Sequence, residues 1–330
     1  MKKNILFIFV ILIIIAGFYT LFSFLNKTTT NNSGKIVIIT TLFPTYDFAK
    51  NIGGDKVDAS LLLPPGVEAH SFEPKPSDVT RINQANIFVY TGEFMEPWAH
   101  DIIEGANKKV RIVDASTGIK LSVDNGHDHD HNHETEEHKD EEHYAEEEHH
   151  HVHNGVDPHI WLDFDNAIQM ASNIEKALEE IDPKNKAYYQ DNLNKYQQSL
   201  LELDDTYKES LSNCQTKTIV YGGHYAFGYL AKKYGLEYEA AQGFSPDAEP
   251  TAKDMISLIE QIKKNNIKYI FYEELSSPKI AETLAKETSA KMLLLNGAHN
   301  LSKEDYEKNT SYLTIMKENL ANLKIGLICN

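Results

Sequence analysis

Residues 183–212 read PKNKAYYQDNLNKYQQSLLELDDTYKESLS, and this stretch decides the fold. Its apolar residues recur at gaps of three or four, which is the spacing of one face of an α-helix. These residues are Tyr189, Leu193, Tyr196, Leu200, Leu203, Tyr207 and Leu211. A helix of about 30 residues spans roughly 45 Å, which is longer than one small domain is wide. The pattern therefore predicts one long, rigid helix that joins two lobes.

Strands and helices alternate on both sides of this helix. Before it, the pattern predicts strands at 35–41, 57–63, 87–91 and 110–114 and helices at 46–52, 76–85 and 163–181. After it, the pattern predicts strands at 218–221, 267–272 and 292–295 and helices at 226–234, 250–265, 278–289 and 302–323. Such alternation is typical of parallel sheets with right-handed crossovers. We expect an α/β fold of two lobes, each a mostly parallel sheet flanked by helices, joined by the long helix.

The expected domains follow from this division. A signal or membrane anchor with its linker occupies residues 1–34, and the N-terminal α/β lobe occupies 35–182. The linking helix is 183–212, and the C-terminal α/β lobe is 213–330. The N-terminal lobe includes a loop at 124–155 that has almost nothing apolar to bury, so we expect this loop to be disordered.

The N-terminal segment predicts export from the cytoplasm. Lys2 and Lys3 precede 21 mostly apolar residues, 5–25. Positive charge before an apolar run is typical of an export signal, and about 20 apolar residues suffice to span a bilayer. We expect a protein outside the cytoplasm, at the cell surface or in the periplasm, tethered by an uncleaved anchor. Cleavage near Ser23 or later is the alternative.

The loop at 124–155 reads DNGHDHDHNHETEEHKDEEHYAEEEHHHVHNG and indicates metal binding. Its twelve acidic residues and one lysine supply −11 of the net charge of −17, and no basic patch suggests a nucleic-acid partner. Imidazole is the commonest protein ligand for zinc, and carboxylates are further donors. The low-affinity candidates are the ten histidines of the loop, His127, His129, His131, His133, His138, His143, His149, His150, His151 and His153.

Three of the five other histidines lie where a predicted strand gives way to a loop. His70 follows LLLPPGVEA, His159 lies in DPHIWLD, and His224 follows TIVYGG, whose two glycines allow a tight turn. Glu273 and Glu274 end another strand, in YIFYEELSSP. Ligands of open α/β sheets bind beyond the carboxyl ends of the strands. Three imidazoles and one carboxylate would form a tetrahedral site that suits zinc.

Five segments resemble the zinc-uptake (ZnuA-type) solute-binding proteins of ABC importers. They are GVEAHSFEPKPSD, DPHIWLD, GGHYAFGYLAKKYGL, GFSPDAEPT and YEELSSPKIAETLAKETSAKMLLLN, in order within 35–325. The resemblance implies two lobes joined by a long helix, with the metal in the cleft between them. It implies the ligands His70, His159, His224 and Glu273. It also implies that the protein is not an enzyme and that it delivers Zn²⁺ to an importer permease.

Several alternatives remain at this point. Glu274 could replace Glu273, although neighbouring strand residues point to opposite faces and only one should reach the cleft. His100 and His299 are expected to be surface or structural residues, with His299 a possible partner of the ligands, and Asp157 could accept a hydrogen bond from a metal-bound imidazole. Cys214 and Cys329 could pair or remain two thiols.

Three other functions compete with zinc delivery. The same scaffold could serve a manganese or iron importer, or a surface adhesin. Manganese prefers oxygen donors, so three imidazoles favour zinc. A zinc hydrolase would use Glu273 as a base beside a bound water, but the chain has neither an HExxH pair nor a GxSxG motif.

Overall fold

A computed structural model of the chain describes residues 34–123, 155–246 and 249–330. The predicted anchor at 1–33 and the histidines of 124–154 lie outside the described residues. Within the described part, every helix is too short or too polar to cross a membrane. Residues 36–330 group into one compact unit.

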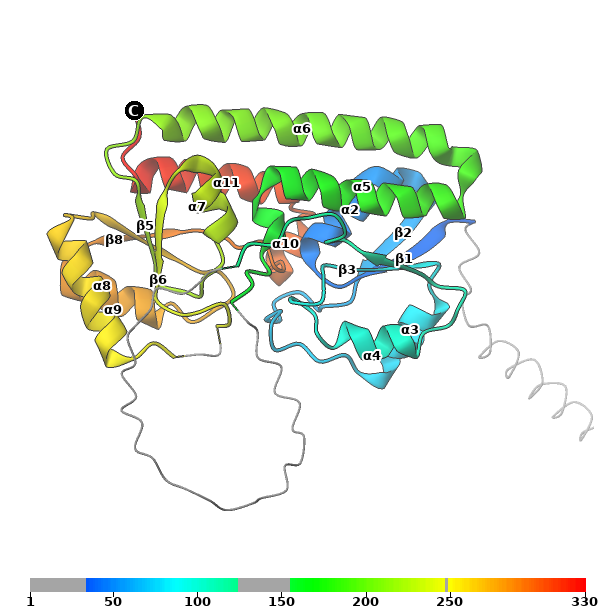
Figure 1. The fold of residues 1–330 in the computed structure, drawn as a ribbon, viewed down its shortest axis with the longest axis horizontal. Helices are drawn as coiled ribbons and strands as arrows, with labels where there is room; N and C mark the ends of the chain where they lie inside the picture. The colour runs from blue at the N-terminus through cyan, green and yellow to red at the C-terminus, as the bar shows by residue number, and fades with distance from the viewer. Residues whose placement is uncertain (1–33, 124–154, 247–248) are drawn as a thin grey trace, which may run out of the picture. The chain divides into compact units, whose positions relative to one another are not determined.

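The long helix is present as α6 (Lys186–Ser212), preceded by a single turn of 3₁₀-helix at Pro183–Asn185. All seven residues of the apolar stripe are buried. The stripe packs against α2 (Phe43–Gly53) and α5 (Phe164–Ile181) from the N-terminal half and against α7 (Gly228–Tyr234) and α11 (Tyr312–Gly326) from the C-terminal half. Figure 1 shows α6 running beside all four helices. The helical spacing of the stripe thus predicted both the helix and its buried face.

The N-terminal sheet is parallel and has the order β2-β1-β3-β4. Its strands are β1 (Ile36–Thr40), β2 (Val57–Leu61), β3 (Ile87–Tyr90) and β4 (Arg111–Asp114). Helices α2 and α5 cover one face, while α3 (Pro76–Gln84) and α4 (Ala99–Glu104) cover the other (Figure 1). Because side chains alternate along each strand, this sheet contributes to two separate apolar layers, one on each face.

The C-terminal sheet repeats this strand order as β6-β5-β7-β8, also parallel. Its strands are β5 (Thr218–Tyr221), β6 (Glu237–Ala240), β7 (Tyr269–Tyr272) and β8 (Lys291–Leu294). Helices α8 (Ala252–Lys264) and α9 (Lys279–Thr288) cover one face, and α7 and α11 cover the other. The predicted fold class is confirmed.

Three local predictions were incomplete. The short elements α4 and β6 were not predicted, because each has only a few residues and little apolar periodicity. The helix predicted at 302–323 is two helices, α10 (Lys303–Glu307) and α11. Asn309 between them has a φ of 54°, and the Ser311 side chain caps the new helix by accepting from the amide of Thr314.

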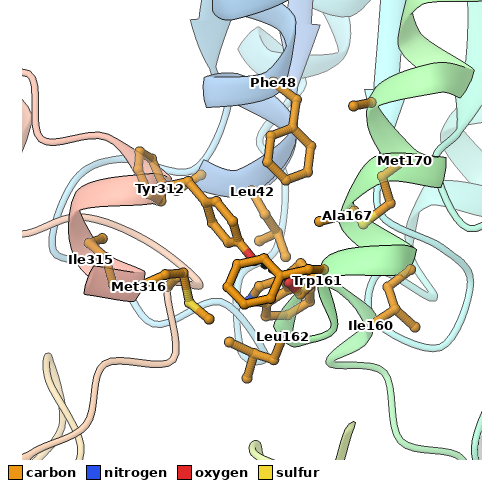
Figure 2. Close-up of a cluster of buried hydrophobic side chains, with 14 of the residues drawn as sticks. Leu42, Phe48, Ile160, Trp161, Leu162, Ala167, Met170, Tyr312, Ile315 and Met316 are labelled. Atoms are coloured by element: carbon orange, nitrogen blue, oxygen red, sulfur yellow. Dashed lines mark hydrogen bonds between the residues drawn. The ribbon is translucent and has the colours of Figure 1, made fainter. Parts of the chain in front are cut away.

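One apolar core joins the two sheets. Figure 2 shows its centre, where Phe48 of α2, Trp161 and Tyr312 of α11 meet. The Trp161 side chain is fully buried and donates from Nε1 to the carbonyl of Gly297, 2.8 Å away. Burial of a large apolar side chain contributes about 1.5–3 kcal/mol to stability. Trp161, which lies two residues after His159, is therefore packed against the C-terminal half of the chain.

Cys214 and Cys329 form a disulfide, which the sequence had left open. Cys214 lies just beyond the end of α6, and Cys329 lies in the segment that follows α11. It closes a loop with a sequence separation of 115 residues, and such cross-links typically add about 2–4 kcal/mol to stability. The C-terminal end of the linking helix is thus covalently fixed to the C-terminal half.

Candidate metal-binding site

Four histidines converge from four different segments. His70 follows β2, and His159 immediately precedes the 3₁₀ turn Ile160–Leu162. His224 follows β5, and His299 follows β8. Each offers one ring nitrogen, and these four atoms all lie within 4.8 Å of one another. The three histidines predicted from strand ends are therefore brought together, with a fourth beside them.

The spacing of the ring nitrogens suits a tetrahedral metal ion. Nε2 of His159 lies 3.3 Å from Nε2 of His70 and 3.2 Å from Nε2 of His224. A tetrahedron with zinc–nitrogen bonds of about 2.0–2.1 Å has edges of about 3.3–3.4 Å. Nε2 of His299 is buried without a hydrogen-bond partner, and an ion held by the cluster would accept the lone pair of this nitrogen. The donor set therefore fits Zn²⁺.

His159 is held in the orientation that a ligand needs. Its Nδ1 lies 2.8 Å from Oδ1 of Asp157, and the same oxygen accepts from the His159 amide at 3.0 Å. This hydrogen bond keeps the proton on Nδ1 and leaves the Nε2 lone pair for a metal. Burial lowers the pKa of His159 well below its usual 6.5, and the neighbouring imidazoles lower it further. The ring is therefore neutral and ready to bind at neutral pH.

Glu273 is not brought into the four-atom cluster. Its Oε1 lies 2.8 Å from Nδ1 of His224, the ring nitrogen not used by the cluster, and off the line of a hydrogen bond. Glu273, the carboxylate expected as the fourth ligand, therefore lies beside His224 and outside the four-histidine cluster. Glu274, which like Glu273 lies just beyond the end of β7, accepts from the Gly297 amide at 3.0 Å. Burial and the charge of Glu273 raise the pKa of Glu274 to about 8.

The fourth histidine of the cluster is His299, where the sequence analysis expected the carboxylate of Glu273. It is only 6% exposed, and burial lowers its pKa well below 6.5, with further lowering by His224 and His70. The expectation of a surface role for His299 is therefore wrong. One available signal was its position after the last strand of a lobe, in LLLNGAHN. His100, by contrast, is exposed beside Glu104 and lies outside the cluster.

The glycines near the site permit close approach. A Cβ at Gly223 would lie 2.8 Å from Oε2 of Glu273, and one at Gly222 would lie 2.5 Å from the Cβ of Ala281 in α9. Both glycines lie in a bend and neither has a positive φ, so the chain turns here as predicted without a left-handed backbone. A Cβ at Gly297 would lie 2.5 Å from Cε1 of His299. Small residues therefore let the ligand segments pack tightly.

A cavity of about 770 Å³ opens beside His70 in the N-terminal half. Its lining includes aromatic rings from Phe72, Phe94 and Trp98 and carboxylates from Glu73, Glu93 and Asp101. Carboxylates in a concave surface raise the local concentration of cations. The cavity therefore gives a cation an approach to the least buried histidine of the cluster.

Fold and site together define a metal-binding α/β protein with two similar sheets and a buried imidazole cluster. A family model described as "Zinc-uptake complex component A periplasmic" (ZnuA) matches residues 38–326. The chain belongs to this family. Its members are extracytoplasmic metal-binding components of zinc uptake, not enzymes.

Individual relatives agree with this assignment. The chain is 38% identical over 323 residues to the high-affinity zinc uptake system protein ZnuA of Bacillus subtilis, covering 96% of this chain and 97% of the relative. It is 37% identical to the zinc-binding lipoprotein AdcA of Streptococcus pneumoniae over 88% of this chain but spans only 56% of that protein. The Zn(II)-bound ZnuA-like domain of AdcA superposes with a TM-score of 0.72 and 34% identity, covering 89% of this chain and 99% of the domain.

Proposed function

We propose that this protein captures Zn²⁺ outside the cytoplasm and delivers it to the permease of an ABC importer. The convergence of four imidazoles is the observation that carries the proposal. Imidazole nitrogens suit zinc, whereas manganese, magnesium and calcium prefer oxygen donors. The relatives named above as zinc-uptake and zinc-binding proteins support the same cargo.

The ligands in this proposal are His70, His159, His224 and His299. Glu273 takes the role of a carboxylate partner that contacts His224 from behind. Four protein ligands fill a tetrahedral shell and leave no position for the water that a catalytic zinc ion keeps. The ligand count therefore favours a carrier over a hydrolase.

Release requires the two lobes to separate their ligands. The lobes are residues 35–182 and 213–330, joined by the helix at 183–212, and each contributes two imidazoles. A small shift of one lobe on docking to the permease would part His70 and His159 from His224 and His299. Residues 1–34 would tether the protein to the membrane, and the histidines of 124–154 would hold further zinc weakly.

Competition titration with a zinc chelator tests the ligand set. Structural zinc binding contributes about 10–16 kcal/mol, so one of four ligands accounts for roughly 3–4 kcal/mol, or a few hundredfold in Kd. We expect His70→Ala and His224→Ala each to weaken the tight site by about that factor. His100→Ala is the matched control, since that imidazole is exposed, and should leave Kd unchanged. Tight binding that survives both ligand substitutions would refute the proposed site.

A further inference from the structure

Residues 296–301, which follow β8 and carry His299, contact every other ligand-bearing part of the site. We call them the His299 segment. Two groups of its contacts bear on the other histidines, one with the C-terminal half and Trp161, the other with the turn that precedes His70. A further bond runs from the Phe43 amide at the start of α2 to the His299 carbonyl, at 3.1 Å. Apart from the bond from the Gly66 amide to the Leu301 carbonyl, the contacts of these two groups are made by side chains outside the imidazole cluster.

The first group fixes the start of the His299 segment. Asn319 of α11 accepts from the Asn296 amide at 2.8 Å and donates to the Asn296 carbonyl at 2.7 Å. Glu274 accepts from the amide of Gly297, and Trp161 donates to its carbonyl. Because Trp161 lies two residues after His159, this group links His299 to His159 and to the end of β7.

The second group consists mainly of one side chain, Asn300, which is 1% exposed. Its Nδ2 donates to the carbonyls of Pro64 and Val67 at 2.7 and 2.9 Å. Its Oδ1 accepts from the Leu301 amide at 2.8 Å, and the Gly66 amide donates to the Leu301 carbonyl at 2.7 Å. Asn300 thus joins the residue next to His299 to the turn at 64–67, three residues before His70.

We infer that Asn300 is a positioning residue that holds His70 against His299 and slows the release of zinc. This inference rests on the proposed zinc site. Two carbonyls of one turn share a single buried amide group, so removal of that group leaves both without this donor. His70 is the least buried of the four imidazoles, so its position depends most on the turn that precedes it. The hydrogen bonds of the Asn300 side chain go to backbone groups, so it acts on His70 through the backbone.

The chain contains a matched control for this contact. Asn173 of α5 is also buried, and its Nδ2 likewise donates to two carbonyls of one turn, those of Ala115 and Thr117, at 3.0 and 2.9 Å. That turn carries none of the four histidines. Asn173→Asp therefore removes the same pair of amide-to-carbonyl hydrogen bonds from a turn that carries no proposed ligand.

The test measures zinc dissociation from the full-length chain into excess chelator, with one equivalent of zinc loaded. Substitution of partners behind a metal ligand typically costs about 10–100-fold in affinity. We expect Asn300→Asp to raise the dissociation rate at least about tenfold, with little change in the association rate. Asn173→Asp should change neither rate by more than about twofold. Circular dichroism and metal-free unfolding temperatures establish that each variant is folded, and Asn300→Ala replaces Asn300→Asp if the latter does not fold.

The same measurement in two further backgrounds separates positioning from a general structural role. In His70→Ala, the effect of Asn300→Asp should shrink to less than about twofold, because the group that Asn300 positions is gone. In His224→Ala the effect should persist. An equal effect in the His70→Ala background, or an unchanged dissociation rate in folded Asn300→Asp, would overturn the inference alone. Wild-type protein that binds no zinc tightly would overturn the proposed function itself.

Discussion

The two sheets have the same strand order, yet they present their histidines differently. In the N-terminal sheet, His70 follows β2, the second strand in the chain, and His159 lies beyond β4, the fourth. In the C-terminal sheet, His224 follows β5, which is the first strand, and His299 follows β8, the fourth. The two sheets share only one such position, since each has a histidine beyond its fourth strand. The two sheets therefore share an edge at which histidines gather, while the connecting segments determine which strand ends bring a histidine to the cluster.

The two halves also differ in how they orient their imidazoles. In the N-terminal half, Asp157 forms a hydrogen bond with Nδ1 of His159. In the C-terminal half, Glu273 approaches Nδ1 of His224 off the hydrogen-bond line, and Gly297 gives His299 its space. The imidazole of His159 in the N-terminal half is thus oriented by a directed hydrogen bond, whereas the imidazoles of the C-terminal half are oriented more by packing.

The largest expected effect distinguishes two residues of the C-terminal half. His299→Ala should raise the Kd for zinc a few hundredfold, because it removes one of four ligands. Glu273→Gln should raise Kd by less than about tenfold, because this side chain contacts a ligand without being one. Competition titration measures both values. If Glu273→Gln had the larger effect, the carboxylate predicted from sequence would be the fourth ligand after all.

A second expected effect compares the carboxylates of the two halves. Asp157→Asn should weaken zinc binding by about 10–100-fold, since it removes the acceptor that sets the His159 tautomer. The loss should exceed that of Glu273→Gln, whose contact with His224 is not a directed hydrogen bond. The same titration gives the ratio. Equal losses would mean that zinc draws Glu273 into line and that the two halves orient their ligands alike.

The pH dependence of zinc affinity should be shallow. Burial lowers the pKa of His159 and His299 in the metal-free protein, so protons compete little for these two imidazoles just below pH 6.5. An imidazole with an ordinary pKa of about 6.5 adds about 0.7 to log Kd between pH 6.5 and 5.5, so we expect a rise of no more than about 1.5, against about 3 for four ordinary histidines. The unfolded chain protonates His159 and His299 more readily, so metal-free stability should fall as pH drops below about 6.5. A rise in log Kd near 3 over this pH range would contradict this account.

The smallest expected effect concerns residues 124–154. Val123 and Val156 pair in an antiparallel bridge, and the Asp157 amide donates to the Ser122 carbonyl at 3.0 Å, so a two-residue turn can replace the deleted segment. We expect Kd of the tight site to change by less than about twofold and the weaker sites to disappear. Calorimetric titration measures both classes. Loss of the tight site on deletion would mean that the four-histidine cluster is not the main site.

Much of this molecule followed from local patterns. The spacing of Tyr189 through Leu211 predicted α6 and its buried face, and short apolar runs alternating with helical stretches predicted seven of the eight strands within the described residues. Strand β6, with the sequence EYEA, escaped prediction because three of its four residues are Glu or Ala, which favour helices. Asn309, with its positive φ, ended α10 early, although a helical pattern continued beyond it.

The site was less predictable because its geometry depends on long-range packing. The strand-end rule located His70 and His224, and DPHIWLD located His159. Local features could not show whether Glu273 or His299 joins the histidine cluster, since both lie near strand ends in the same half. The answer depends on the contacts that Asn319, Trp161 and Glu274 make with the segment containing His299.

The central claim is that four imidazoles, two from each half, bind one zinc ion. X-ray absorption spectroscopy of the chain loaded with one equivalent of zinc tests it most directly. We predict a first shell of four nitrogen ligands at about 2.0–2.1 Å, with the outer-shell scattering of four imidazole rings. A shell of three imidazoles completed by a carboxylate oxygen or a water would contradict the claim.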